Sequence, residues 1–205
     1  MRRVPPFFKG RVVSVDNKGA RKPRADSLRN REQLLAAAKA AFADAGADVA
    51  LEEIARRAGL GIGTFYRHFP TRDALLAAVY QREVEQLTTS ADRLLAERPP
   101  LEAFEAWLHL LVDYLATKRV VAPALQAASA EGARLYAASG APVTDALNRL
   151  GQKLLASGAV RPGVQPEDLT RIIMGLSQGY DRPDWPPSAR RLIAILIAGL
   201  RPAGT

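Results

Sequence analysis

The chain has 205 residues, of which 48% are hydrophobic and 24% charged, and its formal net charge is +8. This length and apolar content suit one or two globular domains and exclude a disordered chain. The absence of cysteine excludes a disulfide scaffold, a thiolate metal site and a cysteine nucleophile. The apolar run 192–200 is too short for a bilayer, which takes roughly 20 residues, and no signal peptide follows Met1. We therefore expect a cytoplasmic protein without a membrane partner.

Positive charge is concentrated at the N-terminus. Residues 1–35 contain ten Lys or Arg and three Asp or Glu, a net +7, whereas the rest of the chain is +1. A basic segment on a nearly neutral body is typical of proteins that bind a polyanion, most often nucleic acid. Prolines and glycines without helical periodicity predict an irregular arm over 1–23. A solvated tail without function is the alternative for residues 1–20.

Four helices are predicted between this arm and residue 97, because apolar residues recur there at spacings of three and four. Gly46 and Gly59 end the first two helices, Pro70 follows the third, and Thr71 can cap the fourth. The predicted ranges are 27–45, 51–58, 62–69 and 72–97.

Five more helices are predicted in the second half of the chain, separated by glycines and prolines. Their ranges are 101–119, 122–137, 142–157, 166–180 and 188–200. Alternating patterns typical of strands are nearly absent, and Val12, Val13 and Val15 form the one weak candidate. The sequence thus predicts an all-α chain of about nine helices.

The second and third helices are joined by Gly59-Leu60-Gly61, a short glycine-containing turn of the helix-turn-helix kind. Gly59 tolerates the positive φ that such a turn requires just after a helix. Ala55 is small enough for the two helices to cross closely, and Leu60 can point inward. We therefore predict a helix-turn-helix at about 50–69.

The third helix can be placed on a wheel at about 100° per residue. Four side chains then point inward: Ile62, Phe65, Tyr66 and Phe69. The outer side carries Gly63, Thr64, Arg67 and His68. That side is slim, carries donors and lacks carboxylates, which suits a DNA major groove. Arginine can read guanine by a bidentate contact, and the hydroxyl of Tyr66 lies at the seam, where it can reach a phosphate.

Residues 54–69 read IARRAGLGIGTFYRHF and are followed by RDAL at 72–75. This pattern resembles the DNA-binding domain of the tetracycline-repressor (TetR) family over about residues 27–87. The resemblance implies an all-α homodimer, in which each subunit has a three-helix DNA-binding head and a larger C-terminal domain for ligand binding and dimerisation. The expected domains are the arm at 1–23, the head at 24–87 and the C-terminal domain at 88–205.

The resemblance also assigns DNA contacts. Thr64, Tyr66, Arg67 and His68 match the contacts of the recognition helix by position, and Arg72 matches a usual phosphate-binding lysine. Gly61 stands where the family usually has a capping Ser or Thr, so that side-chain hydroxyl is missing here. The expected DNA-binding set, with the arm included, is Arg24, Arg29, Gly61, Gly63, Thr64, Tyr66, Arg67, His68 and Arg72.

The C-terminal domain contains no motif with a chemical meaning of its own. Its last helix is apolar nearly all round, so it must be buried on more than one side, either inside the subunit or against a second subunit. Candidate residues of an effector pocket are Trp107, His109, Tyr114, Tyr136 and Met174. Candidate residues of a dimer interface are Leu169, Ile173, Leu176, Ile193, Ala194, Ile197 and Ala198.

These patterns predict a transcriptional regulator, most plainly a ligand-released repressor that binds a palindromic operator in double-stranded DNA as a homodimer. The effector is an unknown small molecule. The alternative is a small-molecule-binding or adaptor protein that keeps the head without specific DNA binding. No catalytic residue, metal or cofactor is expected, because the glycines at 59–63 follow a helix and not a strand, and the two histidines lie far apart in the chain.

Overall fold

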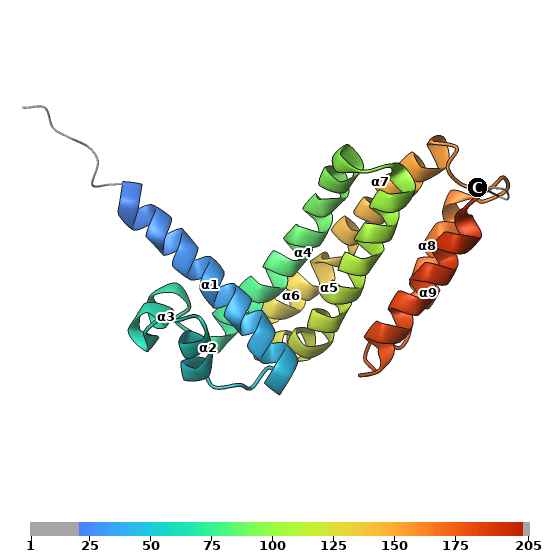
Figure 1. The fold of residues 1–205 in the computed structure, drawn as a ribbon. Helices are drawn as coiled ribbons and strands as arrows, with labels where there is room; N and C mark the ends of the chain where they lie inside the picture. The colour runs from blue at the N-terminus through green and yellow to red at the C-terminus, as the bar shows by residue number, and fades with distance from the viewer. Residues whose placement is uncertain (1–20, 203–205) are drawn as a thin grey trace, which may run out of the picture.

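The computed structural model describes residues 21–202, with side chains from residue 25 onward, and every regular element in that range is an α-helix (Figure 1). This confirms the predicted all-α class. The helices are α1 (Arg21–Ala45), α2 (Leu51–Arg57), α3 (Ile62–His68), α4 (Arg72–Glu97), α5 (Pro100–Ala128), α6 (Ala130–Ala138), α7 (Gly140–Ala156), α8 (Pro166–Leu176) and α9 (Trp185–Leu200). The weak strand candidate at 12–15 and most of the arm lie outside the described residues.

The first helix begins earlier than the sequence predicts. Helix α1 starts at Arg21, inside the segment expected to be irregular and ahead of Ser27. Pro23 does not prevent this, because it lies in the first turn, where backbone N–H groups have no acceptor within the helix. Helix α1 therefore runs without a break across the boundary that the sequence predicts between the arm and the head.

Helix α5 runs through a predicted break. The sequence predicts an interruption between residues 119 and 122, yet α5 continues to Ala128 with Pro123 in its interior. Val121, Ala122 and Leu125 are buried beside the proline, and this packing holds the helix together. The chain breaks at Ser129 instead, where the Gly132 N–H donates to Ser129 Oγ at 3.0 Å and caps α6.

The helices form a small head and a longer body. The head comprises α1, α2 and α3, and α4 runs from it into the body, where it packs most extensively on α5 (Figure 1). Helices α8 and α9 lie at the opposite end of the molecule from the head. In the described part of the chain, no helix combines the length and hydropathy needed to cross a bilayer.

Candidate nucleic-acid interface

The turn between α2 and α3 has the local geometry predicted from Gly59. Its φ is +69°, and the Gly59 N–H donates to Arg56 O at 3.1 Å. The Leu60 N–H donates to Ala55 O at 3.0 Å, which completes a Schellman motif. Leu60 packs against the core as expected. These backbone hydrogen bonds, with the packing of Leu60, set how α3 leaves α2.

The inner side of α3 is held by aromatic residues. Phe65 and Phe69 are buried, and the Arg31 guanidinium of α1 lies 4.8 Å from the centre of the Phe69 ring. Ile62, predicted to point inward, is instead 37% exposed, because it is the first residue of the helix and has no preceding turn to cover it. Tyr66 is 45% exposed, with its ring edge-on to Phe65 at 5.6 Å, so it lies at the seam.

The outer side of α3 is open to solvent. Arg67 is exposed, and its side chain forms no hydrogen bond or ion pair within residues 25–202. Thr64 and His68 are half-buried beside it. An exposed guanidinium without an intramolecular partner is free to bind a ligand outside the subunit, such as the edge of a guanine.

Two glycines at the start of α3 have no role in the packing of the subunit. A Cβ atom added at Gly61 or Gly63 would meet nothing within 4 Å. Gly61 is the N-cap and provides no side-chain hydrogen bond, although its carbonyl accepts from the Thr64 N–H at 2.9 Å. The packing of the described residues therefore does not require glycine at 61 or 63.

We expect Gly63→Leu to have opposite effects on folding and on DNA binding. The free energy of unfolding should rise by about 0.5 kcal/mol, since leucine is the better helix former and would meet open space. Affinity for operator DNA should fall at least about tenfold, because the new side chain would hold the helix away from the bases. Thermal unfolding and fluorescence anisotropy measure the two effects. Unchanged DNA affinity would contradict the placement of Gly63 in the groove.

The other basic residues expected to contact DNA differ in exposure and in the hydrogen bonds that they form. Arg29 is exposed on α1, whereas the side chain of Arg24 is outside the described set. Arg72 is half-buried and donates to Ala47 O at 2.7 Å, so this guanidinium ties α4 to the loop before α2. Thr71 caps α4 as predicted, accepting from the Ala74 N–H at 3.1 Å. The structure therefore gives Arg72 a packing role that its sequence position does not reveal.

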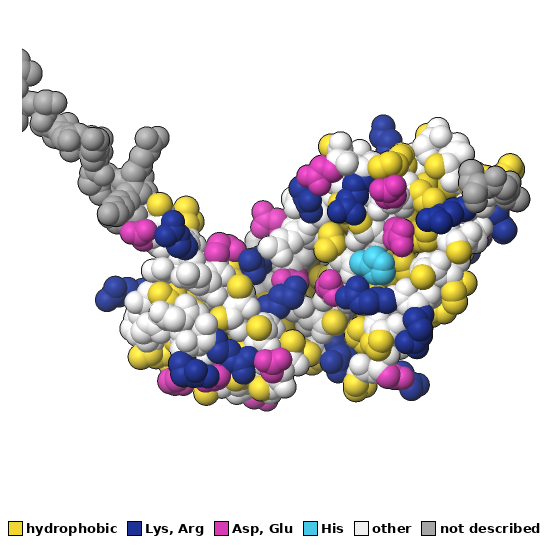
Figure 2. Space-filling view, viewed as in Figure 1, with side chains coloured by type: hydrophobic (Ala, Val, Ile, Leu, Met, Phe, Trp, Pro, Cys, Tyr) yellow, Lys and Arg dark blue, Asp and Glu magenta, His cyan; other side chains and the backbone are white. Residues whose placement is uncertain are grey.

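Acidic neighbours hold two further arginines of α2. Hydrogen bonds from Arg56 and then Arg57 lower the pKa of Glu53 from 4.5 to about 2. Arg57 also binds Asp44 of α1 at 2.6 Å. Figure 2 shows acidic side chains interspersed with Lys and Arg over the head. The unpaired Arg67 thus differs from its basic neighbours on α2.

The predicted pocket residues do not form one site. Trp107 is fully buried, and its indole N–H donates to Leu87 O at 3.0 Å, so it belongs to the core. Met174 is exposed on α8. His109 is half-buried near the surface, with Nδ1 3.3 Å from a guanidinium nitrogen of Arg190. The sequence predicts that these three side chains line one cavity, but the structure does not bring them together.

Tyr114 and Tyr136 do meet, around a tyrosine that the sequence does not distinguish. The hydroxyls of Tyr80 and Tyr114 are 3.2 Å apart, and the ring of Tyr136 stacks on that of Tyr80 at 6.2 Å. Burial raises the pKa of Tyr114 above its ordinary value. Lys118 lies 4.7 Å from the centre of the Tyr136 ring. Tyr80 has the helical spacing of an ordinary core residue, so no local pattern could have indicated its place in this cluster.

The predicted interface residues fall on two different sides of α8 and α9. Ala194 and Ala198 are exposed, and Leu176 is half-buried. The other four are buried in the core of their own subunit, which corrects their placement at a subunit interface: Leu169, Ile173, Ile193 and Ile197. The exposed large apolar side chains of these helices are Ile172, Met174, Leu192 and Ile195. The sequence identifies the helices, but a nearly all-apolar helix does not indicate which side faces outward.

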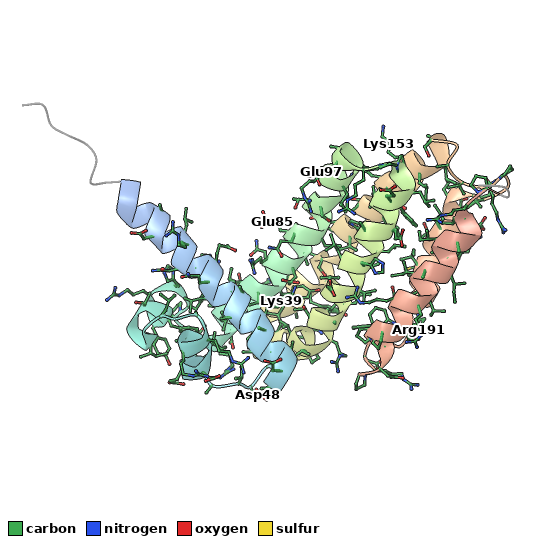
Figure 3. The ribbon with its side chains drawn as sticks, in the orientation of Figure 1. Lys39, Asp48, Glu85, Glu97, Lys153 and Arg191 are labelled. Carbon is green, nitrogen blue, oxygen red and sulfur yellow. The ribbon has the colours of Figure 1, made fainter. Side chains whose placement is uncertain are left out.

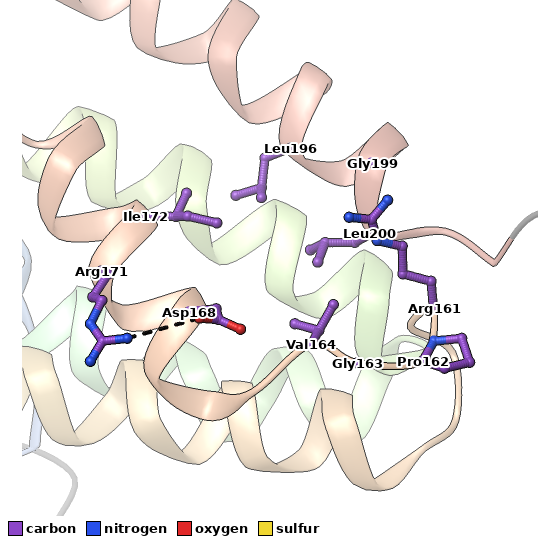
Figure 4. A pocket seen from close by; sticks show the side chains of 10 residues that line it. All are labelled: Arg161, Pro162, Gly163, Val164, Asp168, Arg171, Ile172, Leu196, Gly199 and Leu200. Carbon is purple, nitrogen blue, oxygen red and sulfur yellow. Dashed lines mark ion pairs between the residues drawn. The ribbon is translucent and has the colours of Figure 1, made fainter.

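A hollow of about 680 Å³ lies between α8 and α9 near the end of α9 (Figure 4). Ile172 and Leu196 line it from the two helices, and Arg161 lies at its rim. Arg171 is 4.0 Å from Asp168 on the α8 side. This hollow borders the exposed apolar side chains of α8 and α9, so a second subunit on that face would cover it.

Comparison with known proteins identifies both parts of the chain. Residues 34–79 match the family of bacterial regulatory proteins called the tetR family, and residues 99–202 match the C-terminal domain of SbtR-like transcriptional regulators. The crystal structure of the TetR transcriptional regulator SCO0520 from Streptomyces coelicolor is 41% identical and has a TM-score of 0.72. The match covers 85% of this chain and 99% of the SCO0520 chain.

A TetR transcription regulatory protein from Mycobacterium vanbaalenii is 31% identical, with a TM-score of 0.69 over 87% of this chain and 99% of its own. The transcriptional activator FasR of Mycolicibacterium smegmatis is 37% identical over 103 residues, 46% of each chain. The chain spans about half the length of the curated relatives it matches. With the helix-turn-helix of α2 and α3, these matches establish that the chain belongs to the TetR family of DNA-binding transcriptional regulators, which are not enzymes.

Proposed function

We propose that this regulator is a ligand-released repressor that binds a palindromic operator as a homodimer in the bacterial cytoplasm. The observation that carries the proposal is the outer side of α3, where Arg67 is exposed and unpaired beside the seam residue Tyr66. A dimer would place two such helices in successive major grooves, with centres about 34–36 Å apart. FasR is named an activator, so the direction of regulation requires its own test.

The exposed side of α8 and α9 supports the proposed dimer. Isolated apolar residues are common on protein surfaces, but here Ile172, Leu192 and Ile195 occur together on two adjoining helices. Ala194 and Ala198 lie exposed among them and would let a second helix approach closely. A two-fold axis through this face would bury the same side chains on both subunits. We therefore assign the interface to this outer side.

The tyrosine cluster supports an effector region in the body. Tyr80 belongs to α4, the helix whose first residue, Arg72, bonds to the head loop at Ala47. An effector that binds better when Tyr80 and Tyr136 separate would move α4 and, with it, the head. Release from DNA then requires only that the effector bind more tightly to a dimer whose two heads are not spaced for successive major grooves.

The test is a fluorescence anisotropy titration of the full chain against DNA from upstream of its own gene. Specific binding should survive competition by unrelated DNA, and an inverted repeat should be protected in footprinting. A transcription assay on the same fragment gives the sign of regulation. Binding no tighter than to unrelated DNA would support the alternative, an adaptor that keeps the head without reading sequence.

Removal of residues 1–20 should weaken DNA binding mainly through electrostatics. That segment contains five Lys or Arg and one Asp. If several of them meet phosphates, the slope of log K against log salt should become shallower by roughly 0.9 for each phosphate that is no longer neutralised. The preference for the operator over mutated sites should be retained. An unchanged slope would show that the segment binds no phosphate.

A further inference from the structure

A second potential ligand site lies where α1 of the head meets α4 and α5 of the body. Two adjoining hollows, of about 100 and 240 Å³, share Lys39 of α1 and Asp113 of α5 as lining residues. Figure 3 shows Lys39 on the side of α1 that faces the body. The smaller hollow also includes Glu83 of α4, and the larger includes Arg119 of α5. Tyr114 also lines the smaller hollow, so the junction borders the tyrosine cluster, whereas no residue of α3 lines either hollow.

Glu83 is a carboxylate that is almost fully buried at this junction. Its side chain is only 5% exposed, and one carboxylate oxygen, Oε2, accepts from Lys39 Nζ at 2.5 Å. The other oxygen, Oε1, is buried and has no hydrogen-bond partner among the described residues. A buried carboxylate oxygen without a donor is destabilising, so a donor supplied from outside would be favoured there.

The larger hollow has an unpartnered group of the opposite kind. The Nε–H of Arg119 is buried, and no described residue accepts from it. The junction therefore has a buried acceptor without a donor on a residue that lines the smaller hollow, and a buried donor without an acceptor on a residue that lines the larger one. Phe42 and Val120 line the larger hollow and Leu110 the smaller, so an aliphatic chain can pack there beside the polar side chains of Thr117 and Gln86.

Glu83 has one cationic partner at this junction. Two carboxylates, Glu83 and Asp113, line the smaller hollow with one ammonium, that of Lys39. Asp113 is bound by Arg190 of α9 at 2.5 Å, and Lys39 is the only ion-pair partner of Glu83 among the described residues. A second ammonium could donate to Oε1 by a charge-assisted hydrogen bond, which is stronger than a neutral one.

We propose that this junction binds a small aliphatic primary amine that carries an oxygen acceptor at its other end. The ammonium donates to Glu83 Oε1 in the smaller hollow, and the oxygen accepts from Arg119 Nε–H in the larger one. Because a second ammonium on the same carboxylate repels Lys39 and shares the charge of Glu83, its binding weakens the Lys39–Glu83 ion pair and loosens α1 against α4. The last step rests on the proposed function, since α1 belongs to the DNA-binding head.

The probe is 4-amino-1-butanol, titrated by calorimetry into the full chain in the absence of DNA. Two matched probes each lack one group: 1,4-butanediol has no ammonium, and n-butylamine has no oxygen. We expect 4-amino-1-butanol to bind at least tenfold more tightly than the diol and measurably more tightly than n-butylamine. Absence of binding, or equal affinity for amine and diol, would overturn the proposal.

Variants locate the site. Glu83→Gln should weaken amine binding at least tenfold, whereas Glu85→Gln, an exposed glutamate on the same helix, should leave it unchanged. Should Glu83→Gln unfold, Leu110→Phe fills the smaller hollow and keeps Glu83, and it should abolish binding of the amine. Amine binding that persists in the folded variants would refute the site.

DNA binding is measured separately, so that the two proposals fail independently. If the amine binds but the chain recognises no operator, the proposed function fails and the junction site stands. If the chain recognises an operator but no amine binds, the junction site fails and the proposed function stands. When both bind, 4-amino-1-butanol should weaken the operator complex of the wild type and leave that of Glu83→Gln unaffected at the same concentration.

Discussion

Ile195→Glu is expected to give a folded monomer with only a small fraction of the wild-type operator affinity. Ile195 is 68% exposed in the subunit, so its replacement leaves the core of the subunit intact. In the proposed dimer both copies would bury a glutamate without a partner, at a cost of several kcal/mol, which raises the dimer dissociation constant by at least about 100-fold. A single subunit holds one half-site and forgoes the gain from linking two heads.

The matched control is Ile193→Glu, two residues away on the other side of α9. Ile193 is 1% exposed, and a charge there is buried in the subunit itself, so this variant should fail to fold. Circular dichroism separates the two outcomes, and light scattering after size exclusion gives the mass. A wild type that runs at the 22.2 kDa of one chain in the micromolar range would contradict the dimer and the head spacing that depends on it.

The pair Ile193 and Ile195 also illustrates what the sequence could predict. The run 192–200 is apolar on every side, so its periodicity predicts a helix but not the side that faces the subunit core. The side is set by the packing of α9 on α5, which is a contact between residues far apart in the chain. The same limit applies to Trp107 and Met174, which share an apolar character but lie in the core and on the surface respectively.

Features set by local chemistry were predictable. Gly59 supplies the positive φ of the turn, and Thr71 the cap of α4, and both depend only on near neighbours in sequence. The break predicted between residues 119 and 122 was wrong, because α5 continues through Pro123, where the buried residues outweigh the missing backbone hydrogen bond. The family resemblance predicts a phosphate contact for Arg72, whereas in the structure its guanidinium donates to the carbonyl of Ala47, in the loop after α1. Glu83 and Lys39 are 44 residues apart, and no local pattern joins them.

Arg67→Ala should weaken operator binding by about 1–3 kcal/mol for each half-site and relax the preference at one base pair within it. The reason is that Arg67 is exposed on the outer side of α3 and has no partner in the described part of the subunit, so its guanidinium is available to a base edge. Stability should be unchanged, since the guanidinium has no hydrogen bond or ion pair with residues 25–202 to break. Anisotropy titrations against the operator and a set of single-base-pair variants measure both effects.

Two other head variants distinguish base reading from general electrostatics. Arg56→Ala removes the same charge from α2, where the guanidinium is held by Glu53, and it should weaken all sequences to a similar and smaller extent. Tyr66→Phe keeps the edge-on ring contact with Phe65 and removes the hydroxyl that we expect to bind a phosphate, so affinity should fall while base preference survives. If Arg67→Ala instead weakened every sequence equally, its guanidinium would be a phosphate contact, and α3 would lie in the groove rotated from the orientation proposed here.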